Sequence, residues 1–326
     1  MPSTMTHSYF AIDVYKKLSK TEKNRISNLE DLKLFSQGSD PYMFYHFLIG
    51  KKAKYYGNLQ YYLHSRKTQE YFINLINYIV NNNLSNNKQV IAFLYGNICH
   101  YFLDLNIHPF ILYMGGEYKR RDKSTYKYNA KHQEIEYDID RYLIMKRENI
   151  SVNKFKIHKE IFGNVNLVKE LLECMNVVVF DTYGFKDMGA KYRVSVKYMK
   201  WFFYLANYDR FGIKFNIYKI IDKITPQSVI NVKELSYYNK NINLAYLNED
   251  NARWKDPYIK DKYYNYSFFD LYEKSLNEAV KAIKTVNKYI YGNNRDITIL
   301  KNIFTNLSYV TGYDCDLELE AKYFKY

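Results

Sequence analysis

Residues 90–114 read VIAFLYGNICHYFLDLNIHPFILYM and form a long apolar stretch in this 326-residue chain. The stretch is long enough to cross a membrane, but it contains six residues that are polar or break helices: Asn97, His100, Asp104, Asn106, His108 and Pro109. Unpaired polar groups of this kind are costly in lipid. The pattern therefore predicts a buried helix with a polar stripe, and Pro109 is expected to end that helix.

The flanking sequence has the same helical character. Apolar residues recur at intervals of three and four, as at Phe72, Leu75, Ile76 and Ile79, and 12 Gly and five Pro are too few for the many turns of an all-β chain. We expect helices at 8–19, 42–50, 67–82, 88–106, 130–147, 158–178, 190–207, 213–223, 227–236, 265–289 and 296–306. Together they predict one all-α domain over residues 1–326, with the polar motifs in 1–147 and packing helices in 151–326.

The net charge of +14 and pI near 9.2 favour an anionic partner. Nucleic acid, an acidic membrane surface and a phosphate-bearing substrate all fit, and the abundance of Lys, Asn, Ile and Tyr also fits an AT-rich genome. The start of the chain, MPSTMTHSYF, has no secretory signal, so we expect a cytoplasmic location. Cys99, Cys174 and Cys315 are widely spaced and are interpreted as small buried hydrophobic residues.

Two segments combine histidine with carboxylate at helical spacing. His100, Asp104 and His108 are four residues apart, as are His132 and Glu136. Residues four apart lie on the same face of a helix, so each segment can direct its side chains into one cavity. Imidazole and carboxylate ligands suit zinc, and a site without Cys is typical of catalytic zinc. Any one such pair also arises by chance, but the apolar surroundings of the first segment favour a metal.

The order of these residues resembles the zinc-dependent phospholipase C family, which shares a superfamily with fungal single-strand zinc nucleases. The matching positions are His7, Asp40, His64, His100, Asp104, His108, His132 and Glu136. The resemblance implies up to three zinc ions. Asp40, His64, His100 and Asp104 would hold one ion, and His108, His132 and Glu136 a second. His7 and the processed N-terminus, Pro2 after removal of Met1, would hold the third, with Asp104 as the bridge to the first.

The resemblance further implies hydrolysis of a phosphodiester, with zinc-bound hydroxide attacking phosphorus and Asp40 as ligand and general base. The alternative for Asp40 is an N-cap of a helix that begins near Pro41. The expected substrate is a phospholipid or another phosphodiester, with peripheral contact to a membrane. A single-strand nuclease that acts on nucleic acid is one alternative. A non-catalytic, zinc-stabilised helical binding protein is another. Residues 151–326 lack the strand alternation of a membrane-docking β-sandwich.

Several neighbours of these motifs have two interpretations each. The basic run 119–121 could contact phosphate, although a solvated loop is the commoner role of a charge run. Tyr42, Tyr45 and Tyr101 could line a head-group pocket or belong to the core.

Four further residues near the motifs are not assigned to the site. Asp140 could support a ligand, but a solvated face is the favoured interpretation, and Glu134 lies off the face of Glu136. His46 and His158 are left out of the ligand set.

Overall fold

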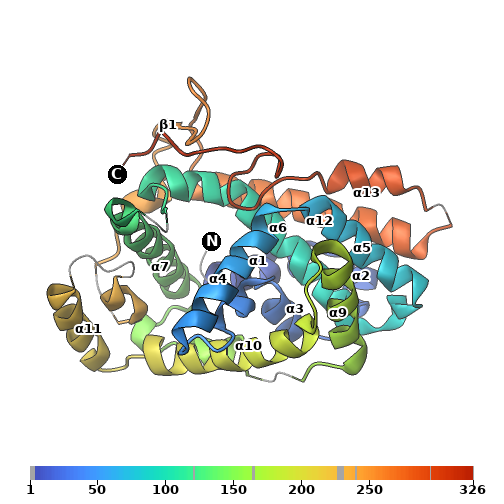
Figure 1. Cartoon of the computed structure of the whole chain (residues 1–326), viewed down its shortest axis with the longest axis horizontal. Coiled ribbons are helices and arrows are strands. Elements are labelled where there is room, and N and C mark those ends of the chain that lie inside the picture. Colours follow the sequence, from blue (N-terminus) through green and yellow to red (C-terminus); the bar gives the residue numbers. More distant parts are fainter. Residues whose placement is uncertain are drawn as a thin grey trace.

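The computed structural model describes residues 4–119, 122–163, 166–225, 231–238, 241–293 and 295–325. These residues form thirteen α-helices, several short 3₁₀ or π turns and one two-stranded sheet, so the fold is all-α, as predicted (Figure 1). The α-helices are α1 Thr4–Lys17, α2 Lys20–Asn24, α3 Leu29–Phe35, α4 Gly50–Ser65, α5 Thr68–Asn81, α6 Lys88–Gly115, α7 Tyr126–Glu148, α8 Ile157–Glu160, α9 Lys169–Tyr183, α10 Met188–Phe202, α11 Ile213–Ile224, α12 Phe268–Tyr291 and α13 Ile297–Ile303.

The short elements lie between these helices. The 3₁₀ helices are η1 Asp40–Phe44, η2 Leu84–Asn86, η3 Lys123–Thr125, η4 Val152–Lys154, η6 Val232–Leu235 and η7 Leu244–Leu247, and η5 Phe203–Asn207 is a π-helix. The strands β1 Trp254–Lys255 and β2 Tyr263–Tyr264 pair antiparallel, with Trp254 opposite Tyr264.

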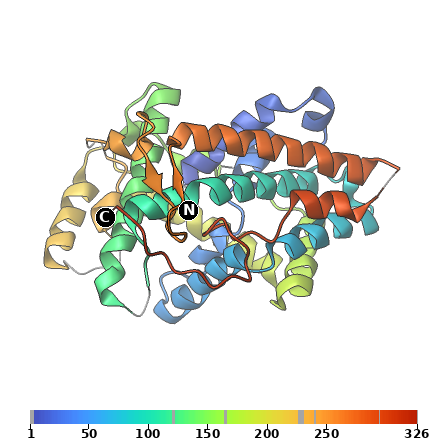
Figure 2. The same cartoon turned by 90° about the horizontal axis from the view of Figure 1, so that it is seen from above.

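Helix α6 is the central element of the fold. The Asn87 side chain caps its start by accepting hydrogen bonds from the backbone N–H groups of Gln89 and Val90. In both views α12 runs alongside it (Figure 2), and α1, α3 and α7 also pack against it. α6 is long and apolar enough to cross a membrane, but 94% of its apolar window is buried inside the protein. α6 is therefore the core helix that its sequence predicts.

Two features of α6 concern its backbone. Gly96 lets α3 approach closely, because a Cβ there would lie 2.5 Å from the Phe35 carbonyl carbon. The prediction that Pro109 ends the helix is wrong, because α6 continues to Gly115. Proline removes one backbone donor from the helix, but Phe110 and Ile111 beyond it are fully buried in the core. Their packing holds the last turns in helical conformation.

The predicted helix at 42–50 is also wrong. The chain forms η1 at Asp40–Phe44 and then the longer helix α4 from Gly50. The sequence does not predict α4, because only a narrow face is buried, with Leu59, Gln60, Leu63 and His64 inside and several tyrosines outside. Its apolar periodicity is correspondingly weak.

The helices α2 and α3 are also absent from the predicted set, although the sequence contains their capping residues. Ser19 and Glu22 form a capping box at the start of α2, and Asn28 caps α3. The predicted helix 158–178 is divided into α8 and α9. In the predicted helix 227–236, residues 226–230 lie outside the described residues, and Val232–Leu235 is a 3₁₀ turn. The other predicted helices agree with the structure to within a few residues at most ends.

Candidate metal centre

The eight motif residues, which come from five separate segments, gather into three groups, two of which share a residue. Within each group the possible ligand atoms lie within 4.8 Å of one another. The groups are His7, His100 and Asp104; Asp40, His64 and His100; and His108, His132 and Glu136. His100 belongs to two of them, so the first two groups form one continuous cluster.

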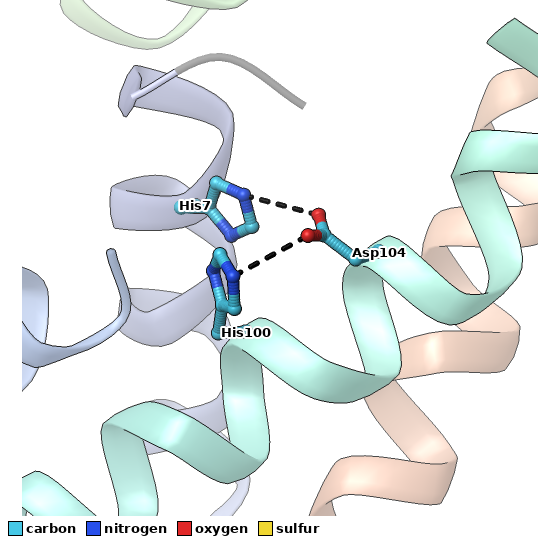
Figure 3. A group of neighbouring side chains, drawn as sticks. All are labelled: His7, His100 and Asp104. Carbon is cyan, nitrogen blue, oxygen red and sulfur yellow. Dashed lines mark ion pairs between the residues drawn. The ribbon is translucent and has the colours of Figure 1, made fainter. Parts of the chain in front are cut away.

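Helix α6 supplies the central side chains. His100, Asp104 and His108 follow one another at four-residue spacing and are at most 2% exposed. Asp104 lies between the two histidines and faces α1, where the His7 Nε2 is 3.2 Å from its Oδ1 (Figure 3). The other oxygen, Oδ2, is 3.3 Å from the His100 Nε2. The polar stripe predicted from the sequence therefore points into one buried site.

The turn between α3 and η1 brings Asp40 to the cluster. Gly38 has a φ of +51°, and a Cβ at this position would lie 2.3 Å from the His100 ring. Glycine is therefore required both by the left-handed backbone and by the close approach of the turn to the imidazole. The Asp40 carboxylate lies 3.2 Å from the His64 Nε2 and accepts a hydrogen bond from the Gln60 Nε2. It faces the site and does not serve as the helix cap of the alternative interpretation.

Backbone carbonyls fix the orientation of three of the histidine rings. The Nδ1 atom of His64 lies 2.8 Å from the Gln60 carbonyl, that of His100 lies 3.1 Å from the Ser36 carbonyl, and that of His108 lies 2.6 Å from the Tyr309 carbonyl. A carbonyl oxygen can only accept, so Nδ1 must carry the proton in each ring. Whenever one of these rings is neutral, its Nε2 atom has a lone pair directed into the site, as in metal-binding histidines.

Two of these lone pairs face each other. The Nε2 atoms of His64 and His100 are 2.9 Å apart, and this contact requires a proton or a metal ion between them. Burial lowers the pKa of His100 to about 4, so its ring is neutral at ordinary pH. Burial also acts to lower the pKa of His64, but the hydrogen bond and charge of Asp40 and the charge of Asp104 outweigh it and raise that pKa above its usual value. In the metal-free protein the proton therefore belongs to His64.

Asp104 and His7 have buried polar atoms without hydrogen bonds. Both carboxylate oxygens of Asp104 and both ring nitrogens of His7 are buried and make no hydrogen bond of good geometry among the described residues, although the two side chains face each other at 3.2 Å. The two side chains are 0% exposed. Leaving buried polar groups in this state costs free energy unless a cation or a proton satisfies them. The donor set, nitrogen and oxygen without sulfur, fits zinc.

The third group lies at the other end of the α6 stripe, between α6 and α7. His132 and Glu136 are one turn apart on α7, with 2.9 Å between the His132 Nε2 and the Glu136 Oε1. The rings of His132 and His108 are 5.7 Å apart. The side chains of His132 and Glu136 are 19% and 11% exposed, whereas the rest of the cluster is buried more deeply. This end of the cluster is its accessible side.

Asp140 on α7 supports the site, so its interpretation as part of a solvated face is wrong. It is fully buried and accepts hydrogen bonds from the backbone N–H groups of Met5 and Thr6, at 3.0 and 2.8 Å. It also accepts bonds from the Thr6 and Tyr237 hydroxyls. A carboxylate at the N-terminus of α1 satisfies the free donors of the first turn and the positive end of the helix dipole. Asp140 thus holds the turn that carries His7.

Of the three tyrosines considered for a pocket, Tyr42 lines the cavity beside His100, and Tyr45 and Tyr101 do not. A cavity beside His100 is lined by five tyrosines: Tyr42, Tyr71, Tyr183, Tyr192 and Tyr309. Tyr101 instead belongs to the core and donates a hydrogen bond to the Thr305 carbonyl. Tyr45 packs against Tyr56 and does not line the cavity.

The remaining residues considered in the sequence lie elsewhere. Glu134 accepts a hydrogen bond from the Tyr246 hydroxyl, on another face of α7 from Glu136. His46 contacts Tyr198, and His158 packs against Tyr204 and Tyr208. All three cysteines are buried and free. Lys119 pairs with Glu320, while Met1, Pro2, Arg120 and Arg121 lie outside the described residues.

Residues 6–183 match the family model for zinc-dependent phospholipase C. The match covers more than half of the chain and includes all eight motif residues. Comparisons with curated proteins and with solved structures found no match.

Proposed function

Because the chain belongs to the zinc-dependent phospholipase C family, we propose that it is a zinc-dependent hydrolase of the phospholipase C type that cleaves the phosphodiester of a phospholipid or a related compound. The observation that supports this best is the His64–His100 contact, in which two Nε2 lone pairs face each other beside the two buried carboxylates Asp40 and Asp104. Such a site is built to hold positive charge.

The proposed ligands follow the three groups. Asp40, His64, His100 and Asp104 would hold one ion, and His108, His132 and Glu136 would hold a second. His7 would contribute to a third ion, with Asp104 shared between that ion and the first. The accessible side at His132 and Glu136 provides the path by which substrate reaches the ions.

The bound zinc would lower the pKa of water and stabilise negative charge on phosphate oxygens. Asp40 is the proposed general base. Burial opposes its ionisation, but His100 and His64 outweigh this effect and lower the pKa of the carboxyl below its ordinary value. The ionised carboxylate, held by Gln60, can accept a proton from the attacking water.

The test is a panel of phosphodiesters assayed with wild-type protein, with and without chelator, after metal analysis. We expect at least one zinc per chain and chelator-sensitive release of phosphorylated head group from phosphatidylcholine vesicles. The high positive charge favours a nuclease as the second candidate, and faster cleavage of single-stranded DNA than of phosphatidylcholine would select it. Bound zinc without turnover of any phosphodiester would identify a binding protein instead.

Asp40→Asn separates catalysis from folding. We expect turnover to fall by roughly 100-fold or more, the usual range for a general base, while the protein stays folded. His158→Gln is the matched control, because His158 is a buried histidine outside the cluster. Unchanged turnover in Asp40→Asn would remove Asp40 from the mechanism.

A further inference from the structure

Helix α11 exposes the apolar side chains that an ordinary surface helix would bury. Ile213, Ile217, Ile220 and Ile224 recur at intervals of three and four, which places them on one face. They are 62%, 50%, 62% and 74% exposed, and none of the residues of α11 is fully buried. We call these four residues the isoleucine face. A solvent-exposed stripe of this kind marks an interaction surface.

Polar contacts on other sides of α11 hold the helix in this orientation. The Asp222 carboxylate accepts hydrogen bonds from the backbone N–H groups of Val232 and Lys233 in η6. Lys214 donates to the Tyr208 carbonyl, and the Asp209 carboxylate accepts from the Phe215 backbone N–H. The isoleucine face is therefore turned outward by specific bonds. In both views α11 lies at the periphery of the molecule (Figures 1 and 2).

The surroundings of the isoleucine face are basic and aromatic. Lys219 and Lys223 are exposed on the helix, and Arg210 is exposed just before it. The acidic residue of α11, Asp222, is bound to η6. Phe211 is 75% exposed beside the start of the helix. Apolar residues flanked by lysine and arginine are the pattern of helices that lie in the interface of an anionic membrane.

We propose that the isoleucine face of α11 docks the protein onto anionic lipid bilayers. The helix would lie in the plane of the interface, with the isoleucines among the acyl chains and Lys219, Lys223 and Arg210 against lipid phosphates. A second copy of the chain fits less well, because a symmetric dimer would bring the same basic residues against each other.

The docking helix is joined to the metal centre through η6. Glu234 of η6 forms a buried ion pair with Arg141 of α7, at 2.9 Å. Arg141 follows Glu136 by five residues on the helix that carries the accessible end of the cluster. Membrane contact at α11 would thus be made by a segment bonded to the helix that presents His132 and Glu136.

The experiment measures co-flotation with vesicles of phosphatidylcholine alone and of equal parts phosphatidylcholine and phosphatidylglycerol. Wild-type protein is expected to bind the mixed vesicles more strongly, and binding should weaken as salt is raised. The double variant Ile217→Glu/Ile220→Glu is expected to bind roughly tenfold less, since it places charges on the inserted face. Lys219→Glu/Lys223→Glu should also bind roughly tenfold less to the mixed vesicles.

Ile299→Glu is the matched control, because Ile299 is an exposed isoleucine on α13, 39% accessible. It should bind like wild type. Turnover of a water-soluble phosphodiester should be the same in all variants, so a failure of the proposed activity is seen separately from a failure of docking. Equal vesicle binding by wild type and the isoleucine variant would overturn the proposal. So would a change of oligomeric state in that variant without loss of vesicle binding, which would identify a contact between protein chains.

Discussion

Three backbone carbonyls determine the protonation of the histidines in the candidate metal centre. Because Gln60, Ser36 and Tyr309 offer carbonyl oxygens to the Nδ1 atoms of His64, His100 and His108, the Nε2 atoms become the available ligands. None of these carbonyls can be recognised as a partner from the sequence, since any residue has one. The carbonyl of Tyr309, for example, comes from a segment 201 positions after His108.

At the residue scale, zinc binding should be linked to one proton on His64. The raised pKa of His64 keeps its ring protonated at pH values below that pKa, and zinc must displace this proton. Zinc affinity should therefore fall as the pH decreases through the raised value, whereas His100, with a pKa of about 4, stays neutral over that range. Calorimetry in two buffers of different ionisation enthalpy counts the protons released.

The variant His64→Ala should release about one proton fewer than wild type on zinc binding and should bind zinc more weakly. His158→Gln should release the same number as wild type, because His158 lies outside the cluster. An unchanged proton count in His64→Ala would show that the displaced proton lies on another group.

At the scale of elements, the metal centre depends on how α1 is held against α7. Asp140 accepts hydrogen bonds from the first turn of α1, one turn or less from His7. Asp140→Asn should lower the free energy of unfolding by about 2–3 kcal/mol, because a buried charged acceptor is lost and an amide donor faces backbone donors. It should also reduce the zinc bound at His7. Chemical denaturation and metal analysis check the two effects.

The comparison for that variant is Asp122→Asn, at an exposed cap of the short turn η3. Asp122→Asn should lower the free energy of unfolding by less than about 1 kcal/mol. If Asp140→Asn lowered the free energy of unfolding no more than Asp122→Asn does, the hydrogen bonds of Asp140 to α1 would not be what stabilises the turn that carries His7.

The sequence indicated the helices whose apolar faces are broad and the motif residues that meet in the site. Helix α5 could be predicted because Phe72, Leu75, Ile76 and Ile79 are all buried on one face. Helix α4 could not, because most of its surface is exposed, and α6 passes through Pro109 because tertiary packing outweighs the local cost.

In the site, the four-residue spacings on α6 and α7 bring their side chains together directly. The supporting contacts were harder to foresee. The hydrogen bond of Asp140 to Met5 joins segments that are distant in the sequence. The hydrogen bond of Gln60 to Asp40 starts from α4, a helix that the sequence does not predict.

At the scale of the whole molecule, the metal centre joins elements that differ in their other contacts. α6 and α12 share a long apolar interface within one connected core. The turn that carries Asp40 and the helix α4 that carries His64 bury fewer apolar residues, and α4 leaves several tyrosines exposed. Bound metal would therefore contribute most to the stability of η1 and α4.

Removing zinc should accordingly destabilise η1 and α4 more than α12. With the cation gone, Asp104 and His7 keep buried polar atoms without hydrogen-bond partners among the described residues, and the folded state loses the binding free energy of the metal. The thermal midpoint should fall by at least ~5 °C. Hydrogen exchange should become faster at residues 36–65, while α12 and its contact with α6 stay protected. Adding zinc back should restore the thermal midpoint and the protection from exchange. If α12 lost protection as well, the metal would stabilise the whole fold rather than the elements that meet at the site.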